Sequence, residues 1–165
     1  KVPVNGHKPF KTVGEILCDL PEPIIDWKET PQINGHVGRN HSLEIKKRYS
    51  QLTFGERDHR TRINKLHPER PSYTIIVGSD KGGGKGHVHP FHPREVTPRE
   101  SARIQTFPDW WEFFGTGRHM IRQVGNAVPP LFAAILANHI LKHVFHQDYV
   151  DAYEEIKQKL ELQFL

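Results

Sequence analysis

The stretch TPRESARIQTFP, residues 97–108, decides how the second half of this 165-residue chain folds. Thr97 and Glu100 form a capping box, in which each side chain accepts a hydrogen bond from a backbone amide at the start of a helix. Pro98 takes the first helical position, where a missing N–H removes no hydrogen bond. The Phe-Pro pair at 107–108 then interrupts the pattern. These residues predict a helix that begins at Pro98 and ends before Phe107.

Downstream, the segment GNAVPP at 125–130 predicts a turn followed by a longer helix that starts at the two prolines. Apolar residues then recur mostly at steps of three and four, which is typical of an amphipathic helix: Leu131, Ala134, Ile135, Ile140, Leu141, Val144 and Phe145. The last stretch, 149–162, predicts another amphipathic helix with Glu and Lys outside. We therefore expect an exposed apolar patch, larger than is usual for a monomer, on the chain by itself.

Upstream, Thr12 and Glu15 form a second capping box, so a short helix is expected through about Leu20. The polar segment 24–70 shows no pattern that assigns an element. Residues 72–77 are β-branched and aromatic, as strands are, and they lead into a Gly-rich basic loop at 78–86. Residues 87–90 are expected to return as an edge strand that proline ends.

Composition indicates a folded piece of something larger. Apolar residues make up 36% of the chain and the mean hydropathy is −0.63, which is low for a self-sufficient core. The aromatic content of 10% argues against disorder. A chain that starts at Lys1 and has its only methionine at Met120 is expected to continue upstream.

Charge and cysteine content narrow the classes of function. No run approaches the roughly 18 apolar residues of a membrane span, so no membrane partner is expected. The single cysteine, Cys18, allows no internal disulfide and makes a cytoplasmic location the default. A formal charge of +4 permits a nucleic-acid partner without requiring one. The spacing of His87, His89 and His92 fits no zinc set, so no metal is expected.

Two segments carry a family resemblance. REVTPRESARIQTFPD at 94–109 resembles motif IX of cytosine-5 DNA methyltransferases of bacterial restriction-modification systems, and RQVGNAVPP at 122–130 resembles their motif X. Their order and the short spacer between them also match. The likeness is sharp over about 66–138 and looser over about 10–65, where the family has its target-recognition region. Two long motifs in the correct order are a far more specific signal than a lone Gly-rich loop.

The resemblance implies a chemistry whose reacting groups lie outside this chain. Members flip the target cytosine out of the duplex, a thiolate attacks C6, and C5 takes a methyl group from S-adenosylmethionine. The family's cofactor turn, Pro-Cys nucleophile, Glu-Asn-Val motif and Gln-Arg-Arg-type motif lie upstream in the usual order and are absent here. Cys18 follows Leu17 rather than proline, so it is expected to be structural and no catalytic residue is assigned.

By resemblance, the pocket for the cofactor S-adenosylmethionine is expected to be lined by Phe107, Asn126, Ala127 and Val128. The alternatives are a core phenylalanine and an ordinary turn before a helix. The expected DNA contacts are Arg94 and the Gly-rich loop, whose candidate residues are Ser79, Lys81, Gly82, Gly83, Gly84 and Lys85. The loop could instead be an exposed hairpin tip. Arg94, Arg99 and Arg103 could equally brace the domains through buried ion pairs. The Arg-rich stretch 57–62 could contact bases or be a solvated face.

These expectations combine into an α+β fold: a small mixed target-recognition lobe at 1–95, then a motif segment and C-terminal helices at 96–165 that dock on an absent Rossmann-like α/β methyltransferase domain. The expected partners are double-stranded DNA and an N-terminal catalytic half, in cis or as a separate subunit. Three functions stay open: part of one methyltransferase, which alone would be inactive; the recognition subunit of a split heterodimer; or a stand-alone DNA-binding module.

Overall fold

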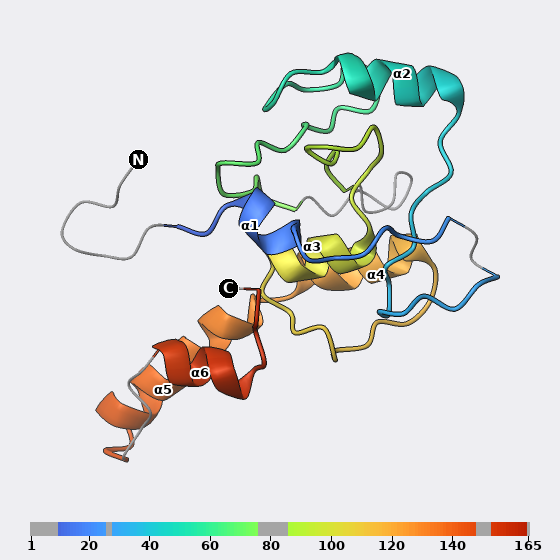
Figure 1. The fold of residues 1–165 in the computed structure, drawn as a ribbon. Coiled ribbons are helices and arrows are strands. Elements are labelled where there is room, and N and C mark those ends of the chain that lie inside the picture. The colour runs from blue at the N-terminus through green and yellow to red at the C-terminus, as the bar shows by residue number, and fades with distance from the viewer. Residues whose placement is uncertain (1–9, 26–27, 76–85, 148–152, 165) are drawn as a thin grey trace.

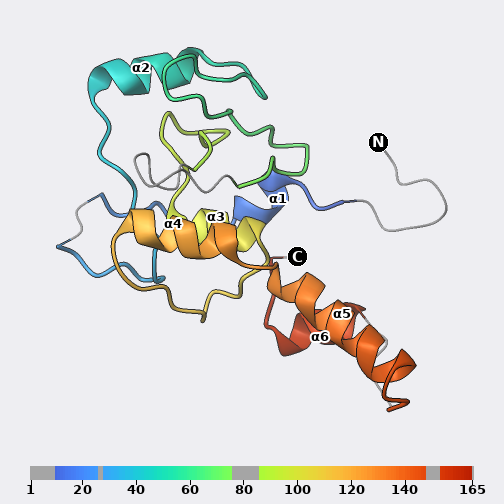
Figure 2. The ribbon, with the colours of Figure 1, turned by 180° about the vertical axis from the view of Figure 1, so that it is seen from behind.

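The computed structural model describes residues 10–25, 28–75, 86–147 and 153–164. The order of helices in these residues is α1 (Val13–Leu17), α2 (Leu43–Gln51), α3 (Pro98–Ile104), α4 (Gly117–Asn126), α5 (Pro130–His143) and α6 (Tyr153–Lys159). In Figures 1 and 2, α1, α3 and α4 lie together in the middle of the molecule, α2 lies at one end, and α5 and α6 project side by side from the other.

Both predicted capping boxes are present. The Thr12 and Thr97 hydroxyls accept hydrogen bonds from the backbone amides of Glu15 and Glu100, at 3.3 and 3.1 Å. The two glutamates accept the return bonds from the threonine amides, each at 2.7 Å. Pro98 stands at the start of α3 as expected. Local hydrogen bonding therefore marks where α1 and α3 begin.

The β part of the expected α+β class is not found in the described residues. Residues 72–75 take no regular structure, and the rest of that expected strand lies outside the described residues. The returning strand at 87–90 is reduced to bridges that Val88 makes with Lys65 and Glu95. Prolines at 68, 71, 90 and 93 remove amide donors on both sides of these bridges. The pairing therefore stops at single residues, and helices with irregular segments make up the fold.

Sequence patterns did not predict two of the helices, α2 and α4. Ser42 caps α2, but only Tyr49 of this polar helix is buried, so its apolar periodicity is weak. Helix α4 starts after Thr116 without a side-chain cap, so the usual start signal is missing. Its buried residues Met120, Ile121 and Val124 do follow helical spacing. That spacing is the signal that could have revealed α4.

In the part of the chain that the structure describes, three apolar clusters form the core. The first joins α1, the start of α5 and the chain after α6, through residues that include Val13, Leu131 and Leu162. The second packs α3 on α4 around Phe107, and the third holds α2 through Tyr49. The first cluster takes residues from both sides of position 95. The division into 1–95 and 96–165 stays a prediction.

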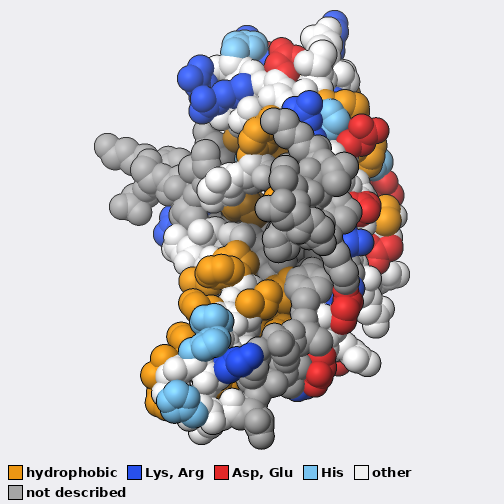
Figure 3. Space-filling model, turned by 90° about the vertical axis from the view of Figure 1, so that its left-hand side faces the viewer, with side chains coloured by type: hydrophobic (Ala, Val, Ile, Leu, Met, Phe, Trp, Pro, Cys, Tyr) orange, Lys and Arg blue, Asp and Glu red, His pale blue; other side chains and the backbone are white. Residues whose placement is uncertain are grey.

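Helix α5 has an apolar surface with little cover. Leu131 is its only buried residue, whereas Phe132, Leu136 and Ile140 are 58%, 47% and 41% exposed. Figure 3 shows apolar side chains gathered at the end of the molecule that carries α5 and α6. Apolar residues of this helix are exposed as expected, and that their patch is larger than is usual for a monomer stays a prediction.

The stretch Gly117–His143 meets the length and composition of a membrane span. It is not one continuous helix, because α4 ends at Asn126 and α5 begins at Pro130. Helix α5 alone, at about 1.5 Å per residue, is about 21 Å long, whereas a bilayer core is about 30 Å thick. The break and the length argue against a span. A cytoplasmic location stays a prediction.

Candidate functional site

The segment expected to line the cofactor joins α4 to α5. Asn126 is the last residue of α4 and is exposed. Ala127 is half-buried and packs against the second core cluster, and Val128 is 59% exposed. The segment is thus anchored at Ala127 and presents the side chains on either side of it to the surface.

Phe107 reaches the same place from α3. It is 5% exposed and stacks edge-on against Phe113 and Trp111, with ring centroids 5.1 and 5.7 Å apart. It belongs to the cluster on which Ala127 packs. The structure therefore brings together Phe107 and Ala127, two of the residues expected to line the cofactor, from the two family-like segments. Phe107 itself is a core side chain here, and its contact with a cofactor stays a prediction.

A strained residue ties these segments to each other. Thr106 has φ +63°, a region that β-branched residues rarely adopt. In this conformation its hydroxyl accepts a hydrogen bond from the Leu131 amide in the first turn of α5, at 3.2 Å. Backbone strain persists where surrounding contacts over-determine it. The link holds the Phe107 segment and the start of α5 in one arrangement.

These residues fit one wall of an S-adenosylmethionine pocket. Ala127 and Val128 offer apolar contact, and the exposed Asn126 amide can both donate and accept hydrogen bonds. The first turn of α5 is capped by the Thr106 hydroxyl, which accepts from the Leu131 amide, and not by its N-cap residue Pro129. That these residues line a cofactor pocket stays a prediction, and such a pocket would need another surface opposite them.

Arg94 and Glu100 form a buried ion pair. The Arg94 guanidinium donates two hydrogen bonds to the Glu100 carboxylate, at 2.8 and 2.7 Å, and the two side chains are 11% and 2% exposed. Burial acts to raise the pKa of Glu100, but the hydrogen bonds and charge of Arg94, together with His89 and the Thr97 amide, outweigh it and hold that pKa below its usual value. Arg94 has an internal role here. Its contact with DNA stays a prediction.

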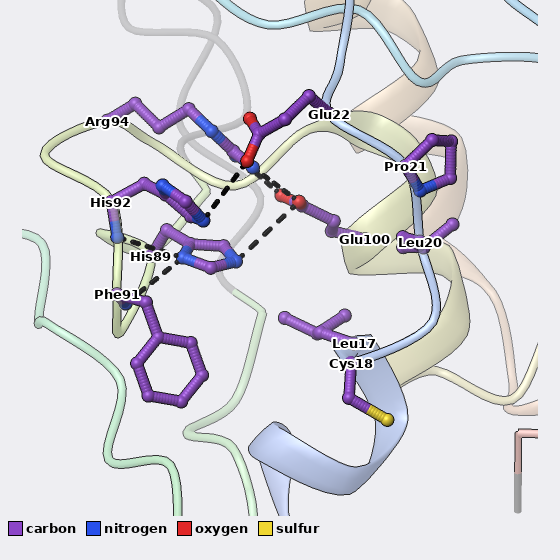
Figure 4. A pocket seen from close by; sticks show the side chains of 10 residues that line it. All are labelled: Leu17, Cys18, Leu20, Pro21, Glu22, His89, Phe91, His92, Arg94 and Glu100. Atoms are coloured by element: carbon purple, nitrogen blue, oxygen red, sulfur yellow. Dashed lines mark hydrogen bonds and ion pairs between the residues drawn. The ribbon is translucent and has the colours of Figure 1, made fainter.

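The same carboxylate faces His89 across a small cavity of about 200 Å³, lined by Leu17, Cys18, Leu20, Pro21, Glu22, His89, Phe91, His92, Arg94 and Glu100 (Figure 4). His89 Nε2 lies 3.7 Å from Glu100, while His89 Nδ1 accepts hydrogen bonds from the amides of Phe91 and His92. The Asn126 segment does not line the cavity, and the charged groups that do line it pair as His89 with Glu100, His92 with Glu22 and Arg94 with Glu100. We interpret it as part of the scaffold.

Burial lowers the pKa of His89 from 6.5 to about 4, although Glu100 partly opposes this. Between those pH values the unfolded chain binds more protons at His89 than the folded chain does. The contribution of neutral His89 to the free energy of unfolding is therefore full above about pH 6.5 and is lost as the pH falls toward 4. We expect His89→Asn, which keeps an acceptor, to flatten the fall in free energy of unfolding between pH 7 and 5 by on the order of 2 kcal/mol.

Urea titrations of both proteins at the two pH values measure this. Burial also lowers the pKa of His36, His41 and His87, so some pH dependence is expected to remain in the variant. An identical slope in the two proteins would contradict a role for His89.

The two arginines of α3 brace the fold. Arg99, whose side chain is fully buried, donates to the backbone oxygens of Asn34 and Pro108, at 2.8 and 3.0 Å. Arg103 pairs with Asp19 after α1 and with Asp109 after α3. Of the two roles considered for these arginines, the structure shows the internal one.

The candidate DNA-contacting residues of the Gly-rich loop, Ser79, Lys81, Gly82, Gly83, Gly84 and Lys85, lie outside the described residues. Gly86, which follows them, is buried against Val96, where an added Cβ would come within 2.8 Å of that side chain. One end of the loop is therefore anchored in the body of the protein, and its DNA contact stays a prediction.

Cys18 is exposed at the end of α1, and its thiol donates to the Glu15 carbonyl at 3.3 Å. We expect Cys18→Ser to leave the free energy of unfolding nearly unchanged, because a surface substitution of this kind shifts stability by about 0.5 kcal/mol or less. Urea denaturation with and without the substitution checks this. A much larger loss would mean that the thiol contributes to the packing of the fold.

Comparisons with known proteins agree on one family. A sequence model of C-5 cytosine-specific DNA methylases matches residues 20–142. Type II methyltransferase M.NgoFVII of Neisseria gonorrhoeae is 34% identical over 97% of this chain, and M.BbvI of Brevibacillus brevis is 34% identical over 90%. The chain covers 44% and 42% of these relatives, which is less than half their length.

A solved structure has a similar fold. It is described as a DNA modification methyltransferase encoded within a prophage, from E. coli. It is 40% identical to this chain with a TM-score of 0.56, over 69% of this chain and 29% of that protein. The shared fold again corresponds to a minor part of a longer protein.

Proposed function

This chain belongs to the family of C-5 cytosine-specific DNA methylases, and from that membership we propose that it is the target-recognition and cofactor-wall part of a DNA (cytosine-5-)-methyltransferase of a restriction-modification system. The complete enzyme would transfer a methyl group to C5 of cytosine in a specific duplex site. This chain would bind and position the cofactor and the target DNA, and the reacting thiol would belong to a catalytic half outside the chain.

The observation that carries the proposal is the meeting of the two family-like segments. Phe107 and Ala127 share one apolar cluster, and Asn126 and Val128 are exposed beside it. The Thr106–Leu131 hydrogen bond holds the segments together. A stand-alone DNA-binding module would have no use for this exposed wall, so the arrangement favours a part of an enzyme.

When bound, S-adenosylmethionine supplies the methyl group as an electrophile. In the proposal, Asn126 hydrogen-bonds the cofactor and Val128 packs against it, while Phe107 and Ala127 keep that wall in place from behind. The Arg94–Glu100 pair and the backbone contacts of Arg99 hold α3 rigidly under the wall. The chain thereby positions groups and excludes water on one side of the pocket.

The exposed side of α5 would dock on the catalytic half. Phe132, Leu136 and Ile140 follow one another at i,i+4 steps along this helix and are all more than 40% exposed. Such a stripe in a soluble monomer marks an interaction surface. Relatives more than twice as long as this chain have the additional protein that could cover it.

The test is transfer of labelled methyl groups from S-adenosylmethionine to unmethylated duplex DNA. It compares this chain, a separately expressed catalytic half of a family member, and the two together. We expect transfer only in the mixture, and sequencing of the product would then give the target site. If the halves associate but transfer nothing, the methyltransferase proposal fails. If they do not associate and the chain alone binds DNA with strong salt dependence, it is a binding module.

A further inference from the structure

Residues 55–65 double back on themselves beside α2 as a hairpin-like loop with one isolated bridge, here named the arginine ribbon. Arg57 and Asn64 make an antiparallel bridge, and the Asp58 amide donates a hydrogen bond to the Ile63 carbonyl at 2.9 Å. The Lys65 amide donates a further hydrogen bond to the Glu56 carbonyl, at 2.8 Å. Ile63 anchors the ribbon in the core cluster of Tyr49. The turn at 58–62 is thereby fixed to the body of the protein at its base.

The turn is held by a buried carboxylate. Asp58 is fully buried and accepts three hydrogen bonds, each 2.6 Å long: two from the amide and hydroxyl of Thr61 and one from Arg48 Nε of α2. Burial acts to raise the pKa of Asp58, but these hydrogen bonds outweigh it and lower that pKa to about 2. The carboxylate stays ionised at neutral pH, and the turn keeps one shape.

The turn also contains backbone strain. Arg62 has φ +63°, in the left-handed region that long side chains rarely adopt, and its amide donates to the Asp58 carbonyl at 2.9 Å. Strain of this kind persists only where neighbouring contacts impose it, and it concentrates at functional positions. An ordinary solvated loop has no need of a strained arginine above a buried carboxylate.

The side chains that this rigid turn presents are cationic and face solvent. Arg57, Arg60 and Arg62 are exposed, and so are Lys46 and Lys47 of the adjacent α2. Arg60 pairs with Glu44 at 2.6 Å, with the two side chains 61% and 70% exposed. An exposed pair contributes little free energy, so Arg60 can exchange Glu44 for another anion. Figure 3 shows Lys and Arg side chains gathered at the end of the molecule where α2 lies.

We propose that the arginine ribbon enters the major groove of the target duplex and that Arg60 and Arg62 contact the DNA there. The major groove is wide enough for two antiparallel chain segments side by side, and arginine can donate two hydrogen bonds to the edge of a guanine. A rigid turn loses little conformational entropy when it binds, which favours affinity and a fixed register. The inference rests on the proposed function, because it names the element by which this chain would recognise its target.

The experiment uses the chain together with its catalytic half and a labelled duplex selected by the wild-type protein from a randomised pool. Arg60→Ala removes an exposed cation, and Arg62→Asn does so with a residue that tolerates positive φ. The matched control is Lys159→Ala on α6, because Lys159 is 63% exposed and also sits in a surface ion pair, 3.3 Å from Glu155. Fluorescence anisotropy over a salt series gives the affinity and its salt slope, and repeated selection gives the preferred sequence.

We expect each ribbon variant to bind the selected duplex about 5- to 150-fold more weakly, the range for loss of one good base contact, with relaxed preference at one position. If the slope of log affinity against log salt concentration falls by about one and the preferred DNA sequence does not change, that arginine contacts a phosphate. The control variant should change affinity less than twofold. If both variants match the control in affinity, slope and sequence preference, the inference is overturned.

Methyl transfer separates this result from the proposed function. Wild-type transfer combined with unaffected ribbon variants would overturn the ribbon inference alone. No wild-type transfer would overturn the proposed function, and the binding comparison would still decide whether the ribbon contacts DNA. Wild-type protein that fails to bind DNA would overturn both.

Discussion

Replacing Leu136 and Ile140 of α5 with aspartate is expected to weaken association of this chain with a catalytic half by at least about 100-fold, which corresponds to about 2.7 kcal/mol. The two side chains are 47% and 41% exposed here, and covering an apolar side chain fully contributes about 1.5–3 kcal/mol. Aspartate in their place would lose its hydration in the interface without a partner, which adds to the loss.

Titration of one half into the other measures this, with methyl transfer as a second readout. Because both positions are exposed, the free energy of unfolding of the chain alone should hardly change, and urea denaturation checks that the variant folds. Leu43→Asp on α2 is the matched control, since Leu43 is 85% exposed and lies far from α5 in Figure 1. Wild-type association of the α5 variant would show that this face does not dock.

Replacing Glu100 with alanine is expected to lower the free energy of unfolding by about 3–5 kcal/mol, the usual result of removing one partner from a buried ion pair. The Arg94 guanidinium would stay buried without its counter-charge, and the Thr97 amide would lose its acceptor at the start of α3. Because α3 supports the wall at Phe107, methyl transfer should fall as the folded fraction falls.

Urea unfolding at pH 7 provides the measurement. Glu44→Ala, which breaks the exposed pair with Arg60, serves as the comparison and should cost less than about 1 kcal/mol. The double variant Arg94→Met with Glu100→Leu should be more stable than Glu100→Ala, because it leaves no buried charge behind. A loss below about 1 kcal/mol for Glu100→Ala would mean that water reaches Arg94 and that the pair is not buried in solution.

Patterns confined to a few neighbouring residues were predictable. Thr12 with Glu15, and Thr97 with Pro98 and Glu100, specify helix starts through bonds that span one turn. The start of α5 at Pro130 follows from the same local rules. The expected strands were wrong within the described residues, because β-branched residues favour strands only when a partner strand supplies hydrogen bonds, and the prolines nearby prevent that.

Pairings between distant residues were not predictable. The sequence identifies Arg94, Arg99 and Arg103 as candidates for DNA contact or for bracing the fold, but it does not distinguish between these two roles. That choice depends on whether a carboxylate or carbonyl meets each guanidinium. Asn34, far away in the chain, provides such a carbonyl for Arg99. The Asp58 turn was hidden for the same reason, since its anchor Arg48 lies on a helix that the sequence pattern did not reveal.

The sequence by itself determined the family, the order of its two long segments and the local starts of α1, α3 and α5, because those depend on residue identity and short-range hydrogen bonding. Only the tertiary structure decided which cations are internal, that Phe107 and Ala127 share one cluster, and that an arginine turn is held rigid above a buried aspartate. Burial and ion pairing depend on which surfaces meet in three dimensions, and the spacing of residues along a chain does not specify that meeting.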